Sequence, residues 1–175
     1  EIAKVGEWPT KAYAVDEKDN VIGLQLDAYA ISLDAELSEL CRLSIITLRN
    51  AHIDDERFLR DLTGLASLNL SGTAISDLSF LKEMKELTSL DLSWTAVSDL
   101  SFLKDMKGLT SLNLSRTKVT NLSFLKELKR LTSLHLGGTN ISDLSFLKNL
   151  KELTSLDLGW TEVSDLSFLK ELKEL

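Results

Sequence analysis

Apolar and polar residues follow a short pattern that returns every 22 residues along most of this chain. In the copy at residues 87–108, Leu90 and Leu92 alternate with polar neighbours, which is the period of a strand with one buried face. The pattern predicts a strand of four or five residues, followed by a turn at Trp94–Thr95. Apolar residues then return at a different spacing, so we expect a tight return path with one helical or 3₁₀ turn near residues 102–106.

The same register begins at seven places, at residues 21, 43, 65, 87, 109, 131 and 153. All six phenylalanines hold the sixteenth position of successive copies, which excludes chance. One copy has too few apolar residues to offset the conformational entropy of its ordered backbone, so neighbouring copies must bury one another's leucines. We therefore predict an elongated solenoid whose strands pair in parallel.

Residues 1–20 lie outside this register and contain the only proline, Pro9. The polar stretch at residues 16–20 separates two apolar runs, which predicts a β-hairpin that covers the first edge of the sheet. The predicted organisation is an N-terminal cap at 1–20 and a repeat array at 21–175. Because Leu175 is the first position of an eighth copy with no capping pattern after it, we expect further repeats or another domain beyond it.

The pattern LxxLxLxxTxIxDLxxLxxL resembles the leucine-rich repeat family in its 22-residue, internalin-like form. The resemblance covers residues 21–175 and implies an α/β solenoid, a right-handed arc with a parallel concave β-sheet and short 3₁₀ or helical convex segments. The asparagine usual at the turn in this family is threonine here, as at Thr95 and Thr117. A threonine hydroxyl can donate one hydrogen bond to a buried carbonyl, so we expect a threonine ladder.

A second resemblance concerns the N-terminal pattern YAVDEKDNVIGLQL followed by SFLK-type repeats. This combination resembles the repeat regions of bacterial Roco proteins. In those proteins the repeats precede GTPase and dimerisation modules, so the resemblance implies a regulatory role. No GTPase motif lies within this sequence.

Charge and cysteine content exclude several function classes. The net charge is −7 and no basic face is evident, which argues against a nucleic-acid partner. Cys41 is the only cysteine, which favours a reducing, cytoplasmic setting over a disulfide framework, with a secreted or cell-surface location as the alternative. No apolar run has the length of a transmembrane helix, so we expect no membrane contact in this segment.

Equivalent positions of successive copies form rows across a parallel sheet, because neighbouring strands lie about 4.8 Å apart. The fifth positions form a polar, mildly acidic row that we call the strand row: Gln25, Thr47, Asn69, Asp91, Asn113, His135 and Asp157. The eighth positions lie where each strand ends and vary most among otherwise similar copies: Ala28, Asn50, Gly72, Trp94, Arg116, Gly138 and Trp160.

Trp94 and Trp160 carry the main binding hypothesis. They lie three copies apart, hence roughly 14 Å, with Arg116 between them. Exposed tryptophan and arginine dominate binding hot spots. The alternative interpretation is that each indole folds over a neighbouring turn and shields it. On the binding interpretation, further contacts come from Asp91, Asn113, His135, Asp157 and Lys118.

His135 and Asp157 occupy adjacent places in the strand row and form a candidate general base or half of a metal site. The simpler interpretation is a solvated polar row. The sequence contains no nucleophile elbow, phosphate-binding glycine loop or paired-cysteine motif. We therefore predict no catalytic residues, no cofactor and no metal.

These observations predict a non-catalytic module that binds a protein partner through the concave sheet and its tryptophan-bearing rim, as a regulatory or recognition part of a larger protein. Two alternatives stay open. One is a surface adhesin of the internalin type, and the other is an enzyme with a His135–Asp157 centre.

Overall fold

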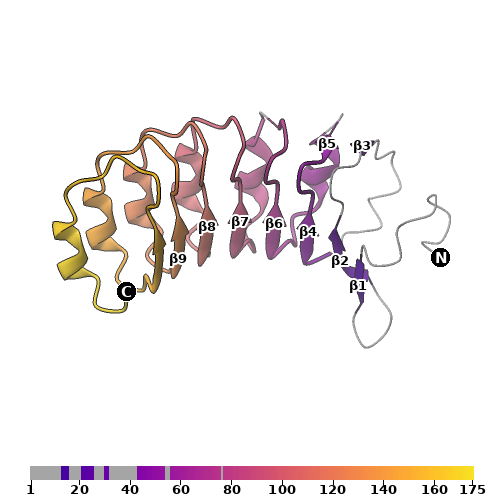
Figure 1. Ribbon diagram of the computed structural model, residues 1–175. Coiled ribbons are helices and arrows are strands. Elements are labelled where there is room, and N and C mark those ends of the chain that lie inside the picture. The colour runs from indigo at the N-terminus through magenta and orange to yellow at the C-terminus, as the bar shows by residue number, and fades with distance from the viewer. Residues whose placement is uncertain (1–12, 16–20, 26–29, 32–42, 54–55, 76) are drawn as a thin grey trace.

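The computed structural model describes residues 13–15, 21–25, 30–31, 43–53, 56–75 and 77–175. Within these residues the chain forms a row of stacked coils, and each coil from residue 43 onward has one short strand on the main sheet, a turn and a short 3₁₀ helix (Figure 1). The strands lie side by side along one side of the row, and the helices fan out more widely along the other side. The sheet is thus the concave side, and the predicted solenoid is confirmed.

Among the described residues the main sheet contains eight strands, which follow the order of the chain. The first two pair antiparallel and all later neighbours pair in parallel. Its strands are β1 (Tyr13–Val15), β2 (Val21–Gln25), β4 (Ile45–Thr47), β6 (Ser67–Asn69), β7 (Ser89–Asp91), β8 (Ser111–Asn113), β9 (Ser133–His135) and β10 (Ser155–Asp157). A separate two-stranded sheet pairs β3 (Ala30–Ile31) with β5 (His52–Ile53) in parallel.

The predicted strand length is wrong for the regular copies, where each strand spans three residues. The reason is visible at Asp91, whose carboxylate Oδ1 accepts a hydrogen bond from the Ser93 backbone N–H at 2.8 Å. This Asx turn bends the chain immediately after β7. The turn accordingly occupies Ser93 and Trp94, one residue earlier than expected.

A 3₁₀ helix forms on the convex side of each described coil from residue 56 onward. The helices are η2 (Glu56–Asp61), η3 (Ser79–Glu83), η4 (Ser101–Asp105), η5 (Ser123–Glu127), η6 (Ser145–Asn149) and η7 (Ser167–Glu171). At the start of η4, the Ser101 N–H donates to Asp99 Oδ1 at 2.9 Å, and hydrogen bonds from the Ser101 backbone and hydroxyl lower the pKa of Asp99. In η5 the same place is held by Asn121, which accepts from Ser123.

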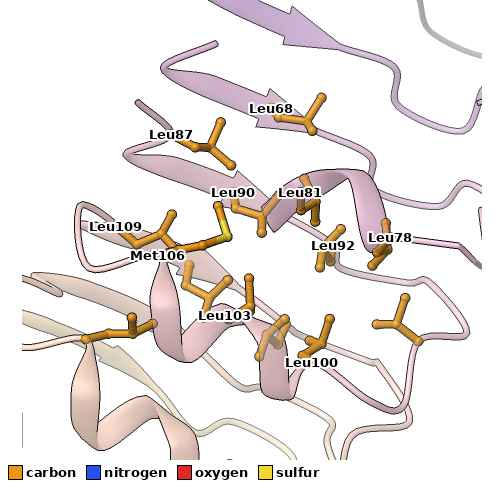
Figure 2. Close-up of a cluster of buried hydrophobic side chains, with 14 of the residues drawn as sticks. Leu68, Leu78, Leu81, Leu87, Leu90, Leu92, Leu100, Leu103, Met106 and Leu109 are labelled. Carbon is orange, nitrogen blue, oxygen red and sulfur yellow. The ribbon is translucent and has the colours of Figure 1, made fainter. Parts of the chain in front are cut away.

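The core fills the space between the sheet and the 3₁₀ helices (Figure 2). Leu90 and Leu92 reach it from the strand side, and Leu103 and Met106 reach it from η4. Each of these side chains is almost wholly buried, and the coils that begin at residues 43, 65, 109 and 131 repeat the arrangement with their own apolar residues. In the coil that begins at residue 153, Leu156 and Leu158 are only partly buried. The interior is therefore continuous from coil to coil, as the repeat pattern requires.

Two threonine rows stabilise the stack in different ways. The expected turn threonines are buried except Thr161, which is partly buried, and the hydroxyl of Thr117 donates to the Leu114 carbonyl of its own coil at 2.7 Å. A second row at the second position joins neighbouring coils, since the Thr110 hydroxyl donates to the Thr88 carbonyl at 3.1 Å. The ladder that connects coils is thus the second row, whereas the predicted row closes each turn internally.

Most of the predicted cap at residues 1–20, together with Cys41 and Ala28, lies outside the described residues. The pairing of β1 with β2 is described, but the boundaries of cap and array remain predictions.

Candidate binding surface

The eighth positions form a row of turns with a left-handed backbone, which we call the exit-turn row. Its described members are Asn50, Gly72, Trp94, Arg116, Gly138 and Trp160, with φ of 53°, 69°, 60°, 57°, 67° and 61°. This backbone region suits glycine and tolerates asparagine, but it costs other residues roughly 1–2 kcal/mol. Tryptophan and arginine therefore occupy positions where the turn itself favours glycine.

Backbone hydrogen bonds hold the exit turns from Asn50 to Gly138 against the next coil. The N–H of Trp94 donates to the Ser115 carbonyl at 2.9 Å, and the N–H of Arg116 donates to the Gly137 carbonyl at 2.8 Å. The Gly138 N–H makes the equivalent bond to Gly159 at 2.7 Å. Because only backbone atoms form these bonds, the side chain at each position is free to differ between coils.

Trp94 and Arg116 contact each other on this row. The guanidinium carbon of Arg116 lies 4.4 Å from the centre of the Trp94 ring, which is a cation–π arrangement. The Trp94 side chain is nevertheless 62% exposed. Trp160 is 90% exposed, and it lies in the coil that begins at residue 153. The structure thus presents both indoles to solvent.

Beside the exit-turn row, the strand row is linked by hydrogen bonds of its own side chains. Asp91 Oδ2 accepts from the Asn113 amide at 3.3 Å, while Asp91 Oδ1 receives the Ser93 N–H. Asn113 Oδ1 likewise receives the Ser115 N–H at 3.0 Å. These polar side chains are therefore fixed in orientation before any partner arrives, which lowers the entropy cost of binding.

His135 and Asp157 are paired in register across β9 and β10, but the polar atoms of their side chains have different partners. His135 Nε2 lies 3.1 Å from the Ser133 hydroxyl of its own strand. Asp157 Oδ1 accepts the Gly159 N–H at 2.8 Å, and its Oδ2 leans over Gly137. No hydrogen bond between His135 and Asp157 appears in the described structure, so the geometry gives the general-base hypothesis no support.

Across the residues that the structure describes, no group of three or more His, Cys, Asp or Glu side chains is arranged to hold a metal ion.

An open groove of about 680 Å³ crosses the concave face on the N-terminal side of Trp94. Its walls are formed by Arg49, Asn50, Asn69, Ser71, Gly72, Asp91, Ser93, Trp94 and Asn113. It brings together three predicted site residues, Asp91, Trp94 and Asn113. The other predicted residues lie outside this groove: Arg116, Lys118, His135, Asp157 and Trp160.

Sequence reasoning missed Arg49 and Asn50 as neighbours of Trp94, because it gave most weight to the half of the array that carries both tryptophans. A usable signal was present. Asn50, Gly72 and Gly138 share one repeat position, and glycine and asparagine at equivalent positions indicate a left-handed turn.

Comparison with known proteins identifies the fold family. The family described as "Leucine Rich repeats (2 copies)" matches residues 129–174. The solved structure of internalin C2 from Listeria monocytogenes is 28% identical in sequence, with a TM-score of 0.82, over 89% of this chain and 69% of the internalin. The chain thus has the leucine-rich repeat fold and is similar to internalins over most of its length.

A second internalin of Listeria monocytogenes, InlF, is also similar to this leucine-rich repeat protein. It is 28% identical, with a TM-score of 0.79, over 87% of the chain. The chain spans only 46% of that internalin's length. The PEPR1–AtPEP1 structure is 22% identical, with a TM-score of 0.70 over 94% of the chain and 25% of its counterpart, and shares the fold. No curated protein sequence matches the chain.

The leucine-rich repeat fold implies a protein-interaction module, as the sequence predicted. In the described part of the chain, no helix has the length and apolar character needed to cross a membrane. The similarity to Roco repeats and the cytoplasmic location stay predictions.

Proposed function

We propose that this leucine-rich repeat protein binds a protein partner through the concave face and the exit-turn row. The contacts come from two sets of residues. On and beside the exit-turn row they are Trp94, Arg116, Lys118 and Trp160, and in the strand row they are Asp91, Asn113, His135 and Asp157.

The observation that carries the proposal is the conformation and exposure of Trp94. Its left-handed backbone favours glycine, and its side chain is 62% exposed. The small apolar area that Trp94 buries therefore does little to offset the backbone strain at this position. Gly72 and Gly138 make the same turn in neighbouring coils without this strain. Exposed aromatic residues in strained backbone are characteristic of binding sites.

A direct test uses random peptides displayed on phage and selected against the immobilised protein. The affinity of the recovered peptides is then measured on the wild type and on Trp94→Gly, which keeps the turn and removes the indole. We expect a loss of about 30-fold or more, the size of a binding hot spot. Glu83→Ala on the convex side is the matched control and should leave affinity unchanged.

Two outcomes would contradict the proposal. One is a selection that enriches no peptide over a bare support. The other is a set of peptides whose affinity is the same on Trp94→Gly and on wild type. Urea unfolding of each variant verifies that any loss of binding is not a loss of fold.

The similarity to two Listeria internalins favours a second setting for the same binding activity, a surface adhesin. The adhesin and the regulatory module use one surface but meet their partners in different places. Fractionation of the source cells separates them. Recovery with the cell surface or the medium supports the adhesin, and recovery in the cytosol supports the regulatory module.

A further inference from the structure

Arg116 is held in place from both sides by its neighbours on the exit-turn row. Its guanidinium carbon lies 4.4 Å from the centre of the Trp94 ring. Its methylene groups lie over Gly138, where a Cβ atom would come within 2.9 Å of Arg116 Cγ. The absence of a side chain at Gly138 therefore provides the space that the Arg116 side chain occupies. A long side chain confined in this way loses less entropy on binding than a free one.

The charge of Arg116 is not neutralised within the described structure. The protein carries a net charge of −7, and Arg60 and Lys151 form ion pairs with Asp77 and Glu171 at 3.1 Å and 3.2 Å. No ion pair of Arg116 is found among the described residues. Asp91, a candidate acceptor in the strand row, has its oxygens engaged by a backbone N–H and by amide groups.

The same coil contains a second cation. Lys118 follows two residues later, is exposed, and likewise has no ion pair within the described residues. Arg116 and Lys118 thus form a small positive spot on an acidic protein, and the spot adjoins the exposed ring of Trp94. Such a local reversal of charge favours association with an anionic group.

We propose that Arg116, stacked on Trp94, is the receptor for a carboxylate in an acidic peptide segment of the partner. Stacking occupies the face of the guanidinium and leaves its N–H groups in the plane free to donate two parallel hydrogen bonds. Lys118 adds attraction as a point charge, and the open part of the Trp94 ring contacts an apolar side chain beside the acidic one. This inference rests on the proposed function and specifies the chemistry of its partner.

The test selects random displayed peptides on the wild type and compares four proteins: wild type, Arg116→Gln, Arg116→Lys and Lys118→Gln. Peptides recovered on the wild type should be enriched in Asp and Glu over the starting library. The best of them should lose at least tenfold in affinity when one acidic residue is changed to its amide. The same peptide should lose at least tenfold on Arg116→Gln. Arg116→Lys should not restore binding, because an ammonium cannot form the planar double contact. Lys118→Gln should lose less affinity for the peptide than Arg116→Gln or Arg116→Lys.

The outcomes separate this inference from the proposed function. Peptides that require Trp94 but bind Arg116→Gln as well as wild type overturn the carboxylate receptor and leave the proposed function intact. A selection that yields neutral or basic peptides also overturns the carboxylate receptor, and so does full binding on Arg116→Lys. The same holds if the wild-type protein retains an anionic lipid vesicle or a single-stranded oligonucleotide more tightly than the acidic peptides. A selection that recovers no peptide overturns both. Because Arg116 is exposed, its variants should unfold at the wild-type urea concentration.

Discussion

The guanidinium of Arg116 lies over the indole of Trp94, and both residues have a left-handed backbone with φ of 57° and 60°. Two of the three residues that depart from the turn's preference for glycine or asparagine therefore contact each other. A fold that needed only to close its turns would use glycine at both places, as it does at Gly72 and Gly138. The contact thus lies in the part of the exit-turn row where the residues suited to binding differ from the glycine that suits the turn.

Trp160→Gly should be more stable than Trp160→Ala by about 1 kcal/mol. Both variants remove the same exposed ring, but only glycine relieves the left-handed backbone of φ 61°. The measurement is the free energy of unfolding from urea titration. Equal stabilities would show that the turn relaxes to another conformation when the indole is removed.

Gly138→Ala should lower the free energy of unfolding by about 1 kcal/mol or more, because its φ is 67° and because the new Cβ meets Arg116 Cγ at 2.9 Å. The displaced arginine should also change the fluorescence of Trp94. Gly108→Ala is the control, since its Cβ has no neighbour closer than 3.7 Å and its φ is not positive. An equal loss in both variants would argue against a specific role for the left-handed turn.

Thr117→Val should cost about 1–3 kcal/mol, since valine has the same shape but leaves the buried Leu114 carbonyl without its donor at 2.7 Å. Thr117→Ser keeps the hydroxyl and should cost less. Thermal and urea unfolding of the two variants give the comparison. A valine variant as stable as the serine variant would mean that the carbonyl finds another donor.

The carboxyls at the starts of the 3₁₀ helices should make stability fall in acid. Hydrogen bonds from Ser101 lower the pKa of Asp99, and the corresponding serines lower those of Asp77, Asp143 and Asp165. A carboxyl whose pKa is lower in the folded state stabilises the fold above about pH 4, and this contribution is lost as the pH falls through the folded-state value.

Replacing all four by asparagine should reduce the fall in urea midpoint between about pH 5 and about pH 3. Asn121 already performs this role in η5 and keeps the hydrogen bond to Ser123 at 3.0 Å, so the variant should fold. An unchanged pH profile would assign the acid sensitivity to other carboxyls.

Much of the fold could be predicted from the sequence because the repeat specifies it many times. The alternation at Leu90 and Leu92 correctly placed the strands, and the changed spacing near residues 102–106 correctly placed a 3₁₀ helix. Strand length was less predictable, because it depends on a hydrogen bond that the Asp91 carboxylate accepts from the Ser93 N–H, and this bond takes the place of pairing within the sheet. The role of Thr110 was also hidden, since an exposed threonine beside a strand has no pattern that marks a bond to the next coil.

The candidate surface was predictable in composition and less so in geometry. Variation at the eighth position drew attention to Trp94 and Arg116, and the structure brings them into contact. Arg49 was missed because the binding hypothesis gave most weight to the half of the array that carries both tryptophans, whereas the structure places Arg49 and Trp94 in the lining of one groove. His135 and Asp157 are neighbours in register, but only the structure shows where their polar atoms point.

Because the register is fixed at 22 residues, the number of coils between two side chains sets the distance between them. Removing residues 109–130 in one piece would keep every remaining strand in phase and would set Trp94 directly beside Gly138, shortening the distance between the two indoles by one coil. Removing one residue more or fewer would turn the following leucines toward solvent. The protein can therefore change the spacing of its contacts only in whole steps of about 4.8 Å.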